Sequence, residues 1–155
     1  ASVRTALVVR SDEQRLPAKP TLADLGRAPS VRWITVHDAI ENKLLLQAGV
    51  APEQIDTVPQ LDQALRALSQ GKADALAISS VSAWNLVTRH PYWPLEVRLM
   101  GDAPAGWPAF VFRLENEPLR DATNQALQDF LGSDEHTALV RRFGFTDEEL
   151  PPDQP

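Results

Sequence analysis

Hydrophobic and polar residues alternate most clearly between residues 59 and 86. Residues 61–70 carry apolar side chains at the i, i+3, i+4, i+7 spacing of an amphipathic helix, and polar side chains fill the other positions. The apolar residues in this register are Leu61, Ala64, Leu65 and Leu68. After Gly71, residues 73–79 have the nearly apolar sequence ADALAIS, which predicts a central strand covered on both faces. A serine-rich turn then opens the next helix.

Similar patterns predict the remaining elements. The predicted strands are residues 3–10, 31–36, 55–58, 95–100 and 109–113, and the further helices are residues 21–27, 39–47, 118–132 and 134–143. Strands and helices alternate from residue 31 to residue 113, and such alternation requires crossover connections. The predicted fold class is therefore α/β, with a mainly parallel sheet and helices on both of its faces.

Two helices carry more detailed predictions. In the helix at 39–47, Asp38 and Glu41 have the spacing of a capping box, and Ile40, Leu44 and Ala48 share one apolar face. The helix at 118–132 directs a longer apolar face toward a core. That face consists of Leu119, Ala122, Ala126, Leu127, Phe130 and Leu131.

Composition narrows the possible functions. The 155 residues fit one domain of ordinary size, and no apolar run approaches the roughly 20 residues that span a bilayer. The net charge is -6 and there is no stripe of Lys and Arg, which argues against a nucleic-acid partner. The chain has no cysteine, so disulfides, thiolate nucleophiles and cysteine zinc sites are excluded.

Candidate ligand-binding residues follow two of the predicted strands. In a sheet of this kind, ligands bind outside the carboxyl ends of the strands, where helix N-termini present free N–H groups. His37, Asp38 and Ala39 follow the strand at 31–36. The serines Ser79, Ser80 and Ser82 follow the strand at 73–79. The alternative is that Asp38 and Ser80 only cap their helices.

Two of the four tryptophans are candidates for the wall of a binding cleft. Trp84 lies one turn beyond the serines, and Trp107 precedes the strand at 109–113. A tryptophan offers a flat apolar surface and one N–H donor, although packing in a core is the alternative explanation.

The same residues also permit an enzymatic hypothesis. His37 beside Asp38 could act with Ser79 or Ser80 in a hydrolase, but the chain lacks a G-x-S-x-G nucleophile turn. Nucleotide-binding motifs of the G-x-G-x-x-G or Walker type are also missing. His37 and Asp38 lack a third metal ligand nearby, so neither a metal nor a cofactor is predicted.

Several blocks of the sequence resemble one protein family. The blocks are DLG, VRWITV and AIENKLL, then VPQLDQALRALSQGKADALAIS, PAFVFRLENEPLRDATNQALQDFL and VRRFGFTDEELP. Together they resemble the extracellular solute-binding proteins of the type II periplasmic binding protein fold, whose fold also serves as Venus-flytrap sensor modules. The most specific block is ALRALSQGKADA.

The resemblance implies a small-solute-binding, non-catalytic module of a bacterial ABC-transporter solute-binding protein, at the periplasmic or extracellular face of the membrane. Its partners would be a small polar molecule and an ABC permease. The alternative is a sensor domain linked to a membrane histidine kinase or cyclase. In both cases two lobes close on the ligand about hinge strands.

The resemblance also predicts how the chain is divided. Residues 1–113 correspond to the second lobe with its hinge strands, and residues 114–155 to C-terminal helices and a tail that pack on a first lobe. ALVVR would be the first hinge strand and AFVFR the return strand. Apolar surface left by the missing first lobe would then favour self-association.

Two positions depart from the family pattern. His37, Asp38 and Ala39 stand where amino-acid binders carry a turn rich in Gly and Thr or Ser, and Ser79 stands where they carry an aspartate for the ligand's amino group. These differences argue against a standard α-amino acid as the ligand. Asp38 would suit a cationic group, and the serines an anionic or hydroxylated one.

Overall fold

The computed structural model describes residues 2–147, 149 and 150, so Glu148 and residues 151–155 of the predicted tail lie outside the described residues. The chain forms two compact units. Residues 4–105 form the sheet unit, and residues from 106 onward, with the N-terminal residues up to Val3, form the C-terminal unit. The sequence predicted a boundary after residue 113, and the contacts divide the chain eight residues earlier, at 105.

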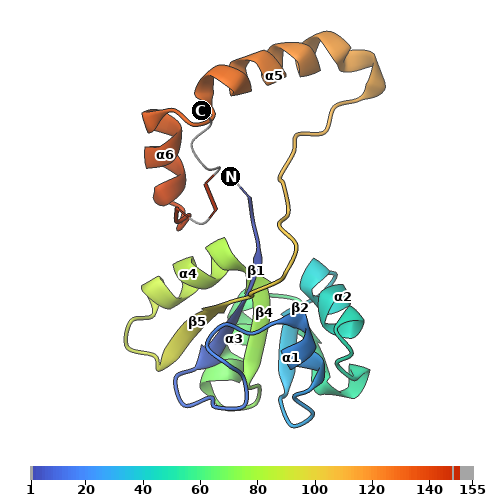
Figure 1. Ribbon diagram of the computed structural model, residues 1–155, viewed down its shortest axis with the longest axis vertical. Coiled ribbons are helices and arrows are strands. Elements are labelled where there is room, and N and C mark those ends of the chain that lie inside the picture. The colour runs from blue at the N-terminus through green and yellow to red at the C-terminus, as the bar shows by residue number, and fades with distance from the viewer. Residues whose placement is uncertain (1, 148, 151–155) are drawn as a thin grey trace. The chain divides into compact units, whose positions relative to one another are not determined.

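The sheet unit is built on five strands. They are β1 (Thr5–Arg10), β2 (Trp33–Val36), β3 (Ile55–Val58), β4 (Ala75–Ser79) and β5 (Leu95–Leu99), in the order β3-β2-β4-β1-β5 (Figure 1). β2 pairs in parallel with β3 and β4, whereas β1 is antiparallel to both β4 and β5. Four strands therefore run in one direction and β1 opposes them. The predicted α/β class with a mainly parallel sheet is confirmed.

Helices cover both faces of this sheet (Figure 1). They are α1 (Leu22–Gly26), α2 (Ile40–Gln47), α3 (Leu61–Ser69) and α4 (Ser80–Arg89), with a 3-10 turn at Pro52–Gln54. Leu25 of α1 and Leu45 of α2 pack with Trp33 on one face. Residues of α3 and α4, with Leu68 and Leu86 among them, form a second cluster on the opposite face.

β4 is buried on both faces, as its apolar sequence predicts. Ala75 and Ala77 belong to the cluster under α1 and α2, and Leu76 belongs to the cluster under α3 and α4. Successive side chains of a strand point to opposite faces, so this division follows directly from the period of two. A central strand with no polar residue between Ala75 and Ile78 can support helices on both sides.

A buried ion-pair network lies at the start of β4. Asp74 is 2% exposed, and its Oδ2 accepts from the Arg32 backbone N–H at 2.9 Å and from Arg32 Nε at 3.0 Å. Its Oδ1 lies 2.8 Å from Arg32 Nη2 and 3.1 Å from Arg15 Nη2. Burial acts to raise the pKa of Asp74, but the hydrogen bonds from Arg32 and Arg15 outweigh it and hold the pKa well below its usual value.

Helix α2 lies where the sequence predicts it, and Leu44 and Ala48 pack against the core, but the predicted cap at Asp38 and the predicted burial of Ile40 are wrong. Asp38 adopts a left-handed backbone with φ of 58°, and Ala39 is the N-cap, without a side-chain hydrogen bond. Ile40 is 72% exposed, whereas Glu41 and Leu45 are the buried residues of the helix. The face that meets the sheet is therefore centred on Glu41 and Leu45, with Leu44 and Ala48 beside them, and Ile40 lies outside it.

The C-terminal unit contains two helices. α5 (Glu117–Phe130) follows a 3-10 turn at Leu114–Asn116, and α6 (Asp134–Arg141) follows the N-cap Ser133. His136 of α6 is buried and contacts the ring of Phe130 edge-on, with ring centroids 5.4 Å apart. An isolated bridge joins Val3 to Gly106.

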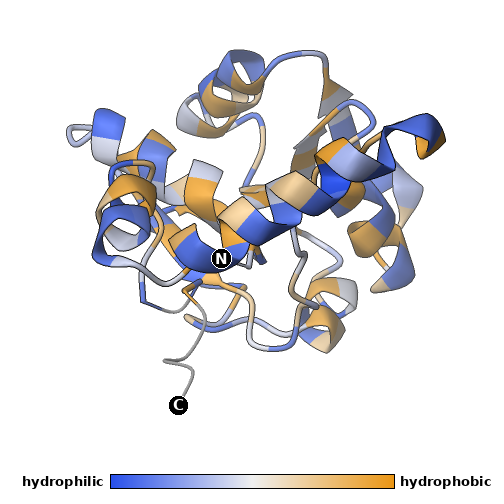
Figure 2. Cartoon of the chain, turned by 90° about the horizontal axis from the view of Figure 1, so that it is seen from above, coloured by the Kyte–Doolittle hydropathy of each residue, from blue (hydrophilic) through white to orange (hydrophobic). Residues whose placement is uncertain are grey.

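Two sequence predictions for this unit are wrong. Residues 109–113 form no strand, and Phe110 and Val111 are 70% and 95% exposed. α5 contains no buried residue, and Leu119 at its start is 57% exposed. Figure 2 shows apolar and polar residues interspersed along the helices. The apolar residues stand at the predicted positions, but among the described residues no strand pairs with the extended segment and no residue of α5 is buried.

We expect Asp74→Asn to destabilise the protein by about 2 kcal/mol at neutral pH, because the partly exposed side chains of Arg32 and Arg15 lose the buried carboxylate that accepts their hydrogen bonds. The folded-state pKa of Asp74 is lowered, so its contribution is complete above about pH 4, the unfolded value, and is lost as pH falls toward the folded value. Urea unfolding of wild type and variant from pH 7 to pH 3 would show the difference shrinking below pH 4.

Asp56→Asn is the matched control, because Asp56 is exposed and forms none of the ion pairs found among the described residues. It should change the free energy of unfolding by less than about 0.5 kcal/mol. A difference between wild type and Asp74→Asn that is independent of pH would contradict the role given to the carboxylate.

Candidate ligand-binding edge of the sheet

The two candidate clusters of the sequence lie at one edge of the sheet. β2 and β4 are parallel neighbours with Trp33 opposite Ala75 and Ile34 opposite Leu76. Their carboxyl ends therefore lie side by side, and α2 and α4 begin there (Figure 1). This edge brings residues 37–39 and residues 79–82 into the same region, as the α/β prediction requires.

The first cluster is the turn between β2 and α2. His37 and Asp38 are exposed, and the backbone N–H of His37 donates to Val58 O at 2.8 Å, which fixes the turn against β3. Ala39 has no side-chain acceptor to offer, so the first N–H groups of α2 receive no cap from the residue before the helix. Asp38 is not the cap that the alternative explanation required.

The second cluster is the serine turn between β4 and α4. Ser79 is the N-cap of α4: its Oγ accepts from the Ser82 backbone N–H at 3.3 Å and donates to Ser82 Oγ at 2.9 Å. Ser80, proposed as a cap in the alternative explanation, is fully buried, and its backbone N–H donates to Arg4 O at 2.7 Å. Trp84 follows on α4 and is half-buried.

Some unpaired polar atoms belong to residues near this edge, on both faces of the sheet: Thr35 is on the face of Trp33, whereas α4 packs on the opposite face. Among the described residues, four enclosed side-chain atoms lack a hydrogen-bond partner. One is Trp33 Nε1 in the core, and the other three are Thr35 Oγ1, Ser80 Oγ and Trp84 Nε1. Thr35 is near the end of β2, and the other two belong to the first turns of α4. Enclosed polar atoms are normally paired, so these four are exceptions.

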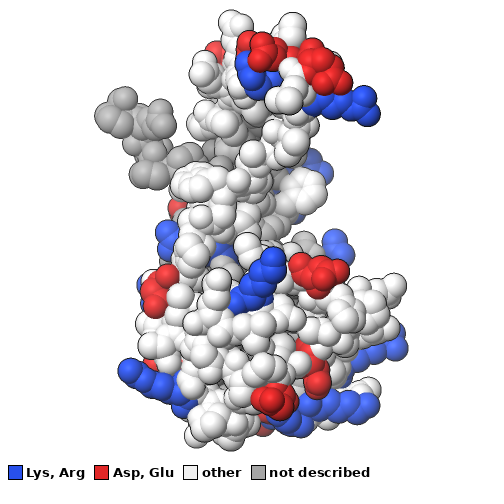
Figure 3. Space-filling view, turned by 90° about the vertical axis from the view of Figure 1, so that its right-hand side faces the viewer, with Lys and Arg blue, Asp and Glu red and all other residues white. Residues whose placement is uncertain are grey.

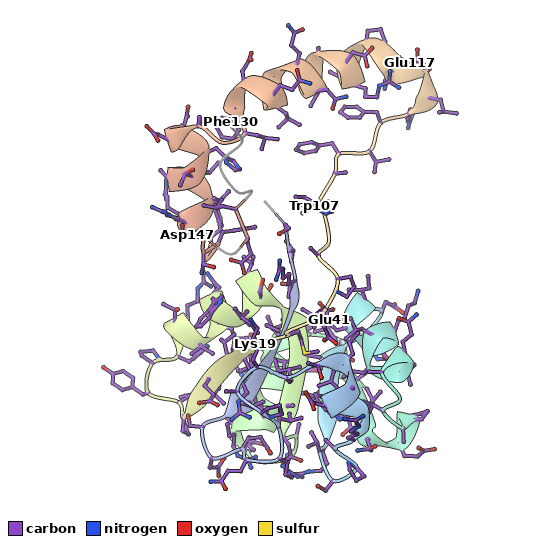
Figure 4. All side chains as sticks on the ribbon, in the orientation of Figure 1. Lys19, Glu41, Trp107, Glu117, Phe130 and Asp147 are labelled. Atoms are coloured by element: carbon purple, nitrogen blue, oxygen red, sulfur yellow. The ribbon has the colours of Figure 1, made fainter. Side chains whose placement is uncertain are left out.

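Glu41 adds a carboxyl group to the same edge. It belongs to the first turn of α2 and is 8% exposed (Figure 4). Burial raises the pKa of Glu41, and a hydrogen bond from its own backbone N–H opposes that rise. The sequence pattern assigned Glu41 to a capping box with Asp38. Glu41 lies four residues before the apolar Leu45, and this spacing was the sequence signal that the two side chains share one face of the helix.

Trp107 belongs to the C-terminal unit and is 69% exposed. With residues of the extended segment and of α5 it lines an apolar groove within that unit (Figure 4). The groove residues used below are Trp107, Phe110, Val111, Leu114, Leu127 and Leu131. The prediction that Trp107 contacts the same ligand as the serines remains a prediction.

A hydrolase that used Ser79 or Ser80 as its nucleophile would need a histidine hydrogen-bonded to that serine. Ser79 is bonded to Ser82, and among the described residues no histidine is hydrogen-bonded to Ser79 or Ser80. The described residues contain no group of three or more possible metal ligands.

Acidic and basic side chains are interspersed on the face that Figure 3 shows.

Comparison with curated proteins finds a relative of the expected kind. The chain is 27% identical over 150 residues to the probable amino-acid ABC transporter periplasmic-binding protein y4tE of Sinorhizobium fredii. The alignment covers 93% of this chain and 48% of that protein, so the chain spans about half the length of the relative. No protein family model matches the chain.

Solved structures agree with this finding. EhuB in complex with hydroxyectoine matches with a TM-score of 0.74 and 24% identity, over 95% of this chain and 57% of that one. An ancestral cationic amino acid solute binding protein also gives 0.74, with 14% identity, over 94% of this chain and 59% of that one. The chain has the fold of the type II solute-binding proteins. The resemblance found in the sequence is confirmed, and the comparisons support neither the sensor nor the hydrolase hypothesis.

Within the described part of the chain, no helix combines the length and the apolar character that crossing a membrane requires.

We expect Ser79→Ala and Ser80→Ala to change the free energy of unfolding by different amounts. Ser79→Ala removes the cap of α4 and should cost about 1 kcal/mol of stability. Ser80→Ala removes an enclosed hydroxyl that has no partner, so the free energy of unfolding should stay equal or rise. Urea unfolding without ligand measures both. A larger loss for Ser80→Ala than for Ser79→Ala would contradict the hydrogen bonds described here.

Proposed function

We propose that this chain is the small-solute-binding module of a bacterial ABC-transporter solute-binding protein and works without catalysis. The observation that carries the proposal is the shared edge at which the parallel strands β2 and β4 end and α2 and α4 begin, with the two candidate clusters beside one another. A polar solute would bind there, outside the carboxyl ends of the strands. The periplasmic-binding protein y4tE supports the transport role and a periplasmic location.

The proposed contacts divide between the two clusters. Ser82 and the serines beside it would receive hydroxyl or anionic groups of the solute, and the uncapped N-terminus of α2 would favour a negative group. His37, Asp38 and Ala39 would border the solute from the β2 side. Trp84 would offer its indole N–H and an apolar surface.

The groove of the C-terminal unit has a separate proposed role. Its exposed apolar residues, including Phe110 and Val111, would be covered by a complementary lobe, and in the complete transport system the liganded protein would meet an ABC permease. The relatives are about twice as long as the aligned chain, which supports a complementary lobe. With this chain alone, a second copy is the available cover.

Solute binding should appear in amide NMR spectra of the chain titrated with amino acids, polyamines, betaines and organic acids. We expect at least one class to shift the amides of residues 37–42 and 79–84. At 100 times its dissociation constant, a ligand adds about 2.7 kcal/mol of stability, which thermal unfolding would detect. Ser82→Ala should weaken binding by about threefold to tenfold, the worth of one neutral hydrogen bond.

Ser69→Ala is the control for this titration, because Ser69 lies on α3 and bonds only to Arg66 O of its own helix. It should leave the affinity unchanged. The proposal would be wrong if no compound class shifted the amides of the edge.

Self-association should be visible by sedimentation velocity. We expect wild type to dimerise as its concentration rises, and Phe110→Ser with Val111→Ser to raise the dimer dissociation constant by about tenfold or more, since each side chain contributes about 1.5–3 kcal/mol when buried. Tyr92→Ser is the control, because Tyr92 is 96% exposed in the sheet unit. A wild type that stays monomeric at all concentrations would contradict this prediction.

A further inference from the structure

The backbone of residues 107–112 has no hydrogen-bond partner among the described residues. The chain just before it is paired: Val3 and Gly106 form an antiparallel bridge, with N–H···O distances of 2.8 and 2.7 Å. The next backbone bond runs from the Asn116 N–H to Arg113 O, in the 3-10 turn before α5. Backbone N–H and C=O groups are strong donors and acceptors, so residues 107–112 present an open row of both.

The same segment also exposes apolar side chains to a groove. Phe110 and Val111 are 70% and 95% exposed, although the sequence predicts a strand there. The groove between this segment and α5 measures about 1470 Å³, whereas pockets for small molecules measure about 300–1,000 Å³. A length of polypeptide therefore fits the groove better than a small molecule does. The polypeptide that also pairs an open backbone edge is a strand.

A second copy of the segment is complementary to the first. When two antiparallel strands pair about a twofold axis at Val111, Ala109 lies opposite Arg113 and Phe110 lies opposite Phe112. Apolar side chains then meet across the strands, and each arginine faces an alanine. A parallel pairing in register would place the two Arg113 side chains next to each other, where like charges repel.

One edge of the segment is suited to this pairing. Along a strand, the backbone groups of successive residues point to opposite edges. Gly106 directs its N–H and C=O toward Val3, so in a continuous strand the even-numbered residues use that edge and the odd-numbered residues, including Val111, use the opposite one. Pro108, which has no N–H, therefore interrupts only the edge on the side of Val3.

We propose that two copies of this chain pair residues 109–113 as antiparallel strands, with Val111 on the twofold axis. The backbone N–H and C=O groups of Ala109, Val111 and Arg113 in each copy bond to the same three residues of the second copy. This inference rests on the self-association in the proposed function, and it adds how the two copies meet: by a backbone ladder as well as by apolar contact.

Cysteine cross-linking tests the register, because the chain contains no cysteine of its own. An equal mixture of Ala109→Cys and Arg113→Cys should form disulfide-linked dimers at least about tenfold faster than either variant alone, because opposed thiols in one dimer have an effective concentration of about millimolar. Opposed residues have Cα atoms about 5.5 Å apart, which a disulfide spans. The two copies of residue 109, like those of residue 113, are about 13 Å apart along the strands, which a disulfide does not span.

Tyr92→Cys is the control for random collision, because Tyr92 is 96% exposed in the sheet unit. Its cross-linking rate should be close to those of Ala109→Cys alone and Arg113→Cys alone. Fast cross-linking of Ala109→Cys alone would mean a parallel pairing in register and would overturn the inference. The same holds for a mixture that cross-links no faster than the single variants where sedimentation shows the dimer.

A second measurement uses wild type and needs no substitution. Amide hydrogen exchange followed by NMR should slow at residues 109, 111 and 113 as the protein concentration rises through the dimer dissociation constant. Exchange at residues 110 and 112 should stay fast, because their N–H groups point to the other edge. Exchange that slows equally at all five residues, or at none of them, in the dimer would contradict the ladder.

The outcomes separate the two proposals. If the protein dimerises without this cross-linking pattern and without alternating protection, residues 109–113 do not pair and self-association stands. If wild type stays monomeric at all concentrations, both self-association and strand pairing fall, and the complementary lobe of the proposed function is left as the cover of the groove. Solute binding at the edge of the sheet is independent of either result.

Discussion

The buried carboxylate of Asp74 ties the start of β4 to the start of β2. It accepts from the backbone N–H of Arg32 and from the side chains of Arg32 and Arg15, so the two strands are held in one register at that end. With Trp33 fixed opposite Ala75, the carboxyl ends of β2 and β4 reach the same edge of the sheet. The neighbouring positions of the turn at 37–39 and the serines at 79–82 depend on this register.

The edge differs from the rest of the sheet unit in how its polar groups are paired. At the Asp74 end, charged groups are matched within the chain, which favours a rigid scaffold. At the opposite end, Thr35, Ser80 and Trp84 keep enclosed atoms without partners, and Glu41 keeps a buried carboxylate. A folded chain tolerates such groups more readily where function requires them, which agrees with the proposal that this end of the sheet binds a solute while the Asp74 end supports stability.

The fold class and most element positions could be predicted because they depend on local patterns. The helix predicted at residues 21–27, the amphipathic face of α3 and the apolar β4 are confirmed. The strand at 109–113 was wrong for a physical reason: an apolar, β-rich segment becomes a strand only where another strand supplies hydrogen bonds. Among the described residues none does so for this segment, whose Phe110 and Val111 are exposed.

The sequence by itself determined the order of strands and helices, the two candidate clusters and the resemblance to solute-binding proteins, because periodicity, caps and motif spacing are written in neighbouring residues. Only the tertiary structure decided which residues of those clusters are buried and unpaired. Asp38 adopts a left-handed conformation before α2, and in that helix Glu41 is buried whereas Ile40 is exposed. Ser79 rather than Ser80 caps α4. Such outcomes depend on how distant segments pack, and no local pattern specifies that packing.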